Sequence, residues 1–270
     1  MKASSYKGSE ARHIIVYGSP KTGKTELIGT LAAKYRLWWF NLDGGIKTLL
    51  APGSAACKNL DNIELFTLPD SQRFPVAVQT LLKVFKGGPH KICHKHGICG
   101  CPAPECKPDD TWSLFDIDKL EVDKDVVVVD HMAQLMDSVN NWIHREALKN
   151  DNWDGLKSEF SDWAKHGAMS DRFGSTWQNA PYNMVLASQE VMAKMPDGST
   201  KLVPVGGTRN QSSDFARYFD DVVYTEIIGG QYRATCTAGD KSQVVIGSRT
   251  GKKLTVPKAG ERTSLLELFA

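Results

Sequence analysis

The sequence predicts an α/β fold with a mostly parallel central sheet flanked by helices. Three observations predict it. A glycine-rich loop lies between an apolar run and a helical stretch, later apolar runs end in acidic or amide residues, and helical patterns separate these runs. Strands that alternate with helices favour parallel pairing. Two adjacent runs near the end of the chain favour a terminal antiparallel hairpin.

The first strand and helix of this fold enclose a glycine-rich loop. Residues 18–25 fit G-x-x-x-x-G-K-[ST], after the apolar run 13–17 and before the helical stretch 26–35. Such a loop directs backbone N–H groups and a helix N-terminus at phosphate, so ATP and Mg²⁺ are the expected cofactors. Lys24 is expected at the β- and γ-phosphates and Thr25 at Mg²⁺. The predicted nucleotide-binding residues are Gly18, Ser19, Pro20, Lys21, Thr22, Gly23, Lys24, Thr25 and Glu26.

The remaining elements follow along the chain from their apolar spacing. Strands are predicted at 37–42, 63–68, 125–130, 183–188, 222–226 and 232–237, and helices at 74–85, 131–149, 156–180, 216–219 and 264–269. The β-branched run 125–130 is typical of a central strand buried on both faces. Gly229-Gly230 predicts the hairpin turn. Residues 191–212 are rich in Gly, Pro, Ser and Lys and predict a mobile loop.

Composition limits the class of protein. The chain has 270 residues, 41% hydrophobic and 24% charged, with a formal net charge of +2. This charge is too small to indicate nucleic acid by itself, so a DNA-binding surface would have to be a local patch. The length fits a single ATPase domain over residues 1–270. The lack of a long apolar segment predicts a cytoplasmic protein that does not enter a membrane.

Two acids follow predicted strands on the same side as the phosphate loop. Asp130 ends the run 125–130, where an acid supports the Mg²⁺ shell in nucleotide hydrolases; it also fits a helix N-cap. Asp43 follows the second run and is the candidate to activate the attacking water. An Asp-Gly turn is the alternative for Asp43. The predicted catalytic residues are Lys24, Asp43, Asp130 and Gln189.

Gln189 directly follows the run 183–188 and lies before the predicted mobile loop. A polar side chain there can hydrogen-bond the γ-phosphate and report the nucleotide state to the loop. Lys194, Lys201 and Arg209 lie in that loop and are candidates for contacts with a DNA backbone. A solvated loop and an ordinary strand end are the alternatives.

Residues 88–110 form an insertion rich in Cys and His within the predicted domain. In a reducing compartment, four thiols within fourteen residues indicate a tetrahedral Zn²⁺ site. The candidate ligands are Cys93, Cys99, Cys101 and Cys106, with His90, His94 or His96 as substitutes. The spacing is not that of paired C-x₂-C knuckles, and a redox cluster or a disordered insertion are alternatives.

The order of these motifs resembles the RecA-type ATPase core, and more narrowly the phage-encoded RecA-like ATPases of single-strand annealing and recombination. Phe40-Asn41-Leu42-Asp43 is similar to the family's strand ending in a catalytic Glu, with Asp43 in its place. Residues 130–135 resemble the family's Asp-Ser-x-Ala-x-Leu segment, and Ala187-Ser188-Gln189 its Asn-Gln switch. The resemblance implies a DNA-binding loop after Gln189, closed by Gly206-Gly207.

The resemblance also implies partners and a subunit interface. A ring or filament of identical subunits would bind ATP between them, with Lys241 and Arg249 as candidates acting from the neighbouring subunit. Single-stranded DNA, and a single-stranded-DNA-binding or other replication protein, are the expected partners in the cytoplasm of a bacterial host. The chain departs from the pattern in lacking a large N-terminal oligomerisation domain, in Asp43, and in the insertion 88–110.

These observations predict an ATPase that binds single-stranded DNA. The alternative is a nucleotide-gated interaction or loader protein in phage replication or packaging, with slow or no hydrolysis. A small-molecule kinase would need an arginine-bearing lid, and Arg172 and Arg209 are too scattered to form one.

Overall fold

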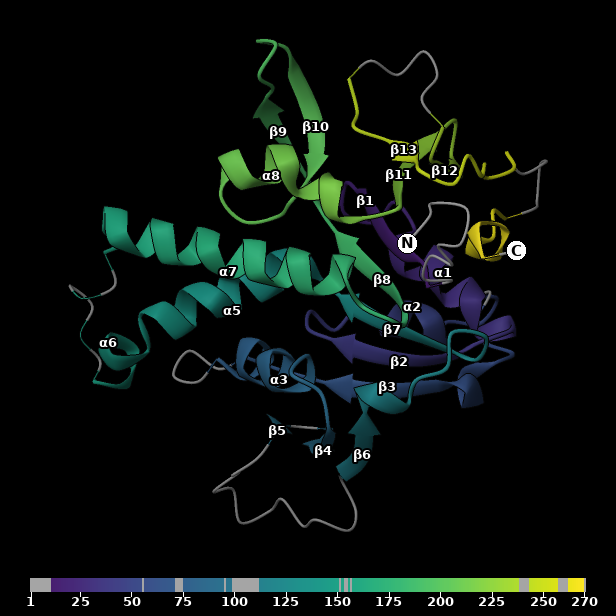
Figure 1. Cartoon of the computed structure of the whole chain (residues 1–270). Helices are drawn as coiled ribbons and strands as arrows, with labels where there is room; N and C mark the ends of the chain where they lie inside the picture. The colour runs from purple at the N-terminus through teal and green to yellow at the C-terminus, as the bar shows by residue number, and fades with distance from the viewer. Residues whose placement is uncertain are drawn as a thin grey trace, which may run out of the picture.

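A central sheet runs through the molecule, with helices on both of its faces (Figure 1). The structure is a computed structural model. It describes residues 11–54, 56–70, 75–94, 96–98, 112–150, 152, 155, 157–237, 243–256 and 262–269. Among these residues, no helix combines the length and the apolar character that crossing a bilayer requires.

The sheet is mostly parallel. Its strand order is β12-β11-β1-β8-β7-β2-β3, in which only the β11–β12 pair of this path is antiparallel among the described residues. The strands are β1 (His13–Gly18), β2 (Arg36–Asn41), β3 (Ile63–Thr67), β7 (Asp125–Asp130), β8 (Asn183–Ser188), β11 (Asp221–Ile228) and β12 (Gln231–Thr235). The short β13 (Gly247–Ser248) pairs antiparallel with the start of β11. The predicted parallel sheet and terminal hairpin are confirmed.

Alternate residues of the central strands pack against different helices. Ile15 and Tyr17 of β1 belong to a core formed with α3, α5, α7 and α8, whereas Ile14 and Val16 belong to a core formed with α1 and the C-terminal turn. The helices are α1 (Lys24–Gly29), α2 (Lys47–Leu50), α3 (Val76–Val84), α5 (Met132–Ile143), α6 (Arg145–Lys149), α7 (Phe160–Gln178) and α8 (Arg209–Phe215). Burial on both faces explains the uninterrupted valines of β7.

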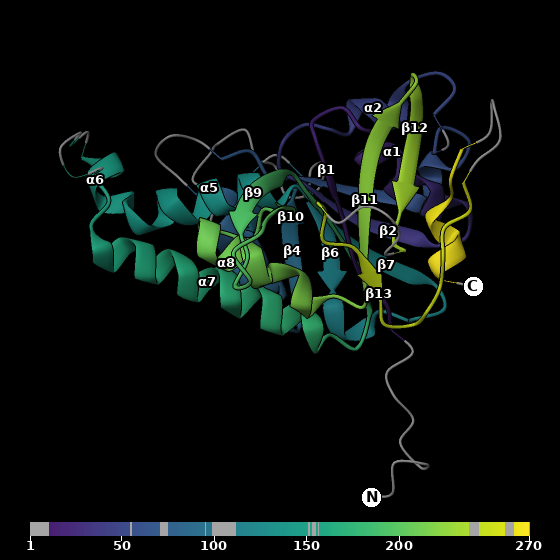
Figure 2. The ribbon, with the colours of Figure 1, turned by 90° about the horizontal axis from the view of Figure 1, so that it is seen from above.

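The helices are unequal in length and position. Figure 2 shows α5 and α7 side by side on one flank of the sheet and the C-terminal turn (Leu265–Leu268) on the opposite flank. The predicted helix 26–35 is shorter than expected, because α1 ends at Gly29 and a 3₁₀ turn (Thr30–Ala33) continues it. Within the predicted helix 156–180, α7 is continuous, since Gly167 and Gly174 pack closely on Gln211 and Tyr218.

The order β1-β8-β7-β2 brings four carboxyl strand ends to one edge. Tyr17 is in register with Ser188, and Asp130 is in register with both Ala187 and Asn41. The residue after β8 therefore lies between the glycine-rich loop after β1 and the acid that ends β7. Loops at this edge of a parallel sheet are where ligands bind in α/β folds.

The predicted mobile loop 191–212 is wrong. It contains the antiparallel strands β9 (Glu190–Lys194) and β10 (Thr200–Pro204), and then α8. The turn between the strands is Pro196-Asp197-Gly198, where Gly198 has a φ of 83° and donates its N–H to Met195 O at 2.9 Å. Pro-Asp-Gly is itself a turn signal, and it marks the end of β9 and the start of β10.

The insertion also contains regular structure. The strands β4 (Pro89–Cys93), β5 (Gly97–Ile98) and β6 (Trp112–Asp116) form a small antiparallel sheet in the order β5-β4-β6. Its buried residues Ile92 and Phe115 join the core under α3. A disordered insertion, one of the alternatives for residues 88–110, is therefore wrong for the described part, because this segment buries its own apolar side chains against the domain.

Candidate functional site

The glycine-rich loop between β1 and α1 is held open by its backbone conformation. Gly23, the N-cap of α1, has a φ of 87°, and Lys21 is the described non-glycine residue with positive φ, at 66°. A Cβ on Gly18 would lie 2.2 Å from the carbonyl oxygen of Thr225 in β11. Strained backbone of this kind gathers at ligand-binding loops, and here both fixed glycines have a steric reason.

Lys24 lies inside this loop rather than in solvent. Its side chain is buried, and its ammonium donates to the carbonyl oxygens of Gly18 at 2.9 Å and Ser19 at 2.8 Å. Burial lowers the pKa of Lys24, while the carboxylates of Asp130 and Glu190 act in the opposite direction. A desolvated cation in a loop of N–H donors forms a site for anionic oxygens.

Thr25 and Asp130 face each other across the sheet edge. The Thr25 hydroxyl lies 3.3 Å from Asp130 Oδ2, and the Asp130 side chain is buried. Burial, followed by the nearby charge of Asp43, raises the pKa of Asp130 to about 7. A buried carboxylate with a hydroxyl and a second carboxylate nearby is a set of hard oxygen donors. These residues fit Mg²⁺.

Asp43 contributes both to a turn and to this acidic cluster. Its Oδ1 accepts the N–H of Gly45 at 2.8 Å, as an Asp-Gly turn requires. A Cβ built on Gly45 would lie 3.0 Å from Asp43 Oδ1, 3.4 Å from Asp130 Oδ2 and 3.5 Å from Thr25 Oγ1. The three oxygens therefore surround one small space, which glycine leaves open.

His131 follows Asp130 and lines the same pocket. Its ring is buried, and burial together with the Lys24 charge lowers its pKa to about 4. The imidazole is therefore neutral at neutral pH and can exchange hydrogen bonds with a ligand without adding charge.

Gln189 joins the pocket to the β9–β10 hairpin. Its side chain lines the pocket, and its carbonyl oxygen accepts the N–H of Val205, after β10, at 2.8 Å. The next residue, Glu190, accepts a hydrogen bond from the Ser19 hydroxyl in the glycine-rich loop. Sequence reasoning missed Glu190; its position between Gln189 and an alternating run was the available signal.

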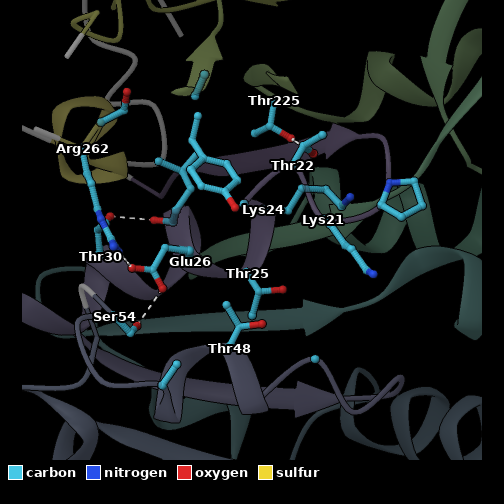
Figure 3. A pocket seen from close by; sticks show the side chains of 18 of the residues that line it. Lys21, Thr22, Lys24, Thr25, Glu26, Thr30, Thr48, Ser54, Thr225 and Arg262 are labelled. Atoms are coloured by element: carbon cyan, nitrogen blue, oxygen red, sulfur yellow. Dashed lines mark hydrogen bonds and ion pairs between the residues drawn. The ribbon is translucent and has the colours of Figure 1, made fainter. Parts of the chain in front are cut away.

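One pocket of about 860 Å³ unites these groups, and Figure 3 shows part of its lining. All four predicted catalytic residues line it, and so do Pro20 to Glu26 of the loop, whereas Gly18 and Ser19 are not among its lining residues. The sequence did not predict the other wall. That wall comes from the turn Ala51–Ser54, from Gly230–Ala234, and from Arg262 and Thr263 near the C-terminus.

The structure describes only some of the predicted zinc ligands. Cys99, Cys101 and Cys106 lie outside the described residues, and within the described part no group of three metal-binding side chains occurs. His94 is wrong as a substitute ligand, because its ring nitrogens lie 2.6 Å from Leu65 O and 2.8 Å from Ser113 Oγ.

Two other candidate ligands lie close together, and one histidine bonds to the backbone. Buried Cys93 has its Sγ 3.6 Å from Nδ1 of His96. The Nε2 of His90 lies 3.1 Å from Gly87 O.

The remaining candidates lie away from the pocket lining. Lys194 and Lys201 are on β9 and β10, and Arg209 begins α8. Arg249 follows β13, beside the first residue of β11, so it lies at the opposite end of the sheet; its guanidinium donates to Arg217 O. Lys241 lies outside the described residues.

Comparison with known proteins identifies a family for most of the chain. Residues 10–250 match the model of a family described as an AAA domain. No curated protein matches the chain. The matched region contains the glycine-rich loop and every predicted catalytic residue, and it ends before Arg262 and Thr263.

Proposed function

The chain belongs to this AAA domain family and is a P-loop ATPase-like domain, and on that premise we propose that it hydrolyses ATP with Mg²⁺ and binds single-stranded DNA. The proposal includes the RecA-like arrangement, a role in phage recombination or annealing, and assembly into a homo-oligomeric ring or filament with ATP between subunits. A single-stranded-DNA-binding or other replication protein is the proposed further partner.

The observation that carries the ATPase proposal is the convergence of Lys24, Thr25, Asp43, Asp130 and Gln189 on one pocket from four strand ends. Phosphoryl transfer requires mainly positioning and charge stabilisation. Lys24 would neutralise phosphate charge, Thr25 and Asp130 would hold Mg²⁺, and the bound Mg²⁺ would supply further charge neutralisation. Asp43 orients the attacking water, and Gln189 contacts the γ-phosphate.

Steady-state phosphate release tests this assignment. Lys24→Ala should lower the rate at least about 100-fold, because a buried cation at the transferred phosphate is lost. The exposed Lys83→Ala on α3 is the matched control and should keep the wild-type rate. Normal turnover by Lys24→Ala, with an unchanged melting temperature, would contradict the proposal.

The DNA proposal is supported by the path from Gln189 to the β9–β10 hairpin. The hairpin begins at the residue after Gln189 and carries Lys194 and Lys201, so a change at the phosphate has a short route to a basic surface. Single-stranded DNA should then stimulate ATP hydrolysis.

The second candidate function is the nucleotide-gated interaction or loader protein. Asp43 favours it, because one oxygen of this short carboxylate is already engaged by Gly45 N–H. A slow rate that single-stranded DNA does not change would select this function over the recombination ATPase.

We also propose that the insertion binds Zn²⁺. The support is the 3.6 Å separation of Cys93 Sγ and His96 Nδ1, which suits two ligands on one edge of a tetrahedral site. Elemental analysis of protein purified without chelator should give about one zinc per chain, and Cys93→Ser should lower it. A wild-type content near zero would remove the proposal.

A further inference from the structure

The pocket extends beyond the glycine-rich loop, along one face of α1. Gly23, Glu26, Leu27 and Thr30 line it at the spacing of one helical face. The seven residue steps from Gly23 to Thr30 span roughly 10 Å at about 1.5 Å per residue, which is enough length for a ribose and a base beyond the phosphates. The total volume of about 860 Å³ is in the range of small-molecule sites.

Tyr232 overhangs the start of this groove. Its ring carbons lie 3.0 to 3.6 Å from the position that a Cβ on Gly23 would occupy, and the residue is 60% exposed. The ring is thus fixed beside the phosphate loop with most of its surface open. An aromatic face in that position is suited to stacking on a planar ring.

The far end of the groove is closed by the C-terminal segment. Arg262 pairs with Glu26 of α1, and the Ser54 hydroxyl donates to the other carboxylate oxygen of Glu26 at 2.7 Å (Figure 3). Leu265 anchors the segment, since its N–H donates to Thr30 Oγ1 at 3.0 Å and its side chain is buried. The ion pair with Arg262 neutralises Glu26, the residue after Thr25, whose negative charge would otherwise repel anionic phosphates.

We infer that this groove is a nucleoside subsite built within one chain, in which the base of a purine nucleoside triphosphate stacks on Tyr232 and Arg262 cancels the charge of Glu26. The inference rests on the proposed nucleotide function and deepens it. The Arg262 wall lies beyond the region that matches the family model. A purine gains more than a pyrimidine on such a platform, because its larger ring covers more of the tyrosine.

Calorimetric titration with two probes separates the base from the phosphates. With Mg²⁺ present, Tyr232→Ala should weaken ATP binding about 10-fold or more and leave the binding of inorganic tripolyphosphate within about 2-fold. Tyr232→Phe should retain ATP affinity. Phe160→Ala, another exposed aromatic, is the control and should change neither.

The outcomes distinguish this inference from the proposed function. Unchanged ATP affinity in Tyr232→Ala, or equal weakening of both probes, would overturn the stacking role. Tighter or equal binding of CTP relative to ATP would overturn the purine assignment. A wild-type chain that binds neither probe would instead overturn the proposed function, and Lys24→Ala should lose both.

The Arg262 role has its own test. Arg262→Ala removes the positive charge that pairs with Glu26 and should weaken the binding of ATP and of tripolyphosphate alike. The double variant Glu26→Gln/Arg262→Ala should restore most of the affinity. A double variant as weak as Arg262→Ala, with an unchanged melting temperature, would overturn charge cancellation.

Discussion

Gly45 keeps open the space that Asp43, Asp130 and Thr25 surround. Its φ is not positive, so alanine is compatible with its backbone, but the added methyl would lie 3.0 Å from Asp43 Oδ1. Gly45→Ala should therefore raise the Mg²⁺ concentration needed for half-maximal ATPase activity about 10-fold, with little change in melting temperature. A Mg²⁺ titration of activity measures it.

Gly247 supplies the matched control for that variant. It also lacks a positive φ, and a Cβ there would meet nothing within 4 Å. Gly247→Ala should show the wild-type Mg²⁺ dependence. Equal Mg²⁺ dependence in Gly45→Ala and wild type would show that the metal lies elsewhere.

Asp130 makes the stability of the nucleotide-free protein depend on pH. Its pKa is raised to about 7 by burial and by Asp43, so the folded chain binds more protons than the unfolded chain between about pH 4 and 7. Stability from this group therefore falls as the pH rises through that window. Asp130→Asn cannot ionise at this position and should not lose stability in this way. In the presence of a chelator, its melting temperature should therefore exceed that of wild type by several degrees at about pH 8, and by less at about pH 5.

Magnesium should reduce the difference in melting temperature between Asp130→Asn and wild type. Excess Mg²⁺ stabilises the wild-type carboxylate but not the amide, so the advantage of Asp130→Asn should shrink when Mg²⁺ and ATP are added. Differential scanning fluorimetry with and without chelator measures both effects. An Asp130→Asn margin that is the same at both pH values would argue against a raised pKa.

Among the elements, the β9–β10 hairpin carries the proposed DNA contact. Replacing Lys194 and Lys201 by Glu should weaken the binding of single-stranded DNA and reduce its dependence on salt concentration. With fewer phosphate contacts, the protein releases fewer counterions from the DNA when it binds. ATP binding should persist, since neither lysine lines the pocket. Fluorescence anisotropy at several salt concentrations measures the change.

The pair Lys83 and Lys86, exposed near the end of α3, gives a control with the same change of charge. Lys83→Glu/Lys86→Glu should bind DNA nearly as wild type does. If both double variants lose the same affinity, the hairpin has no specific role and only the overall charge matters.

The sequence was most informative for elements whose chemistry is local. The spacing of 18–25 between an apolar run and a helix predicts the loop, and the valines of 125–130 predict a strand buried on both sides. The pairing of β4 with β6 could not be predicted from the sequence, because it joins residues on either side of the segment 99–111 and depends on burial against α3. Tyr232 and Arg262 carry no motif, and only the fold brings them to Gly23 and Glu26.

At the scale of the whole molecule, the pocket joins the early and late parts of the chain. The loop after β1 contacts β11 through the hydrogen bond between Thr22 and Thr225, 2.8 Å long. The 3₁₀ turn that follows α1 contacts the C-terminal turn through Thr30 and Leu265. Figure 1 shows this turn beside α1. A ligand that fills the pocket therefore touches segments that are more than 200 residues apart, and its binding should stabilise the fold as a unit.

Leu268 connects this arrangement to overall stability. Its side chain is fully buried in the core that contains Leu31 and Tyr35, and the turn it anchors follows the pocket residues Arg262 and Thr263. Leu268→Ala should cost about 2–5 kcal/mol of unfolding free energy through the cavity it leaves. It should also weaken ATP binding, because the loosened turn no longer fixes the pocket wall.

Val256 is 67% exposed, so the control variant Val256→Ala should change neither the stability nor the ATP affinity. Chemical denaturation and ATP titration of both variants measure the two effects. Loss of stability without any loss of ATP affinity would show that the C-terminal segment supports the core alone and forms no part of the nucleotide site.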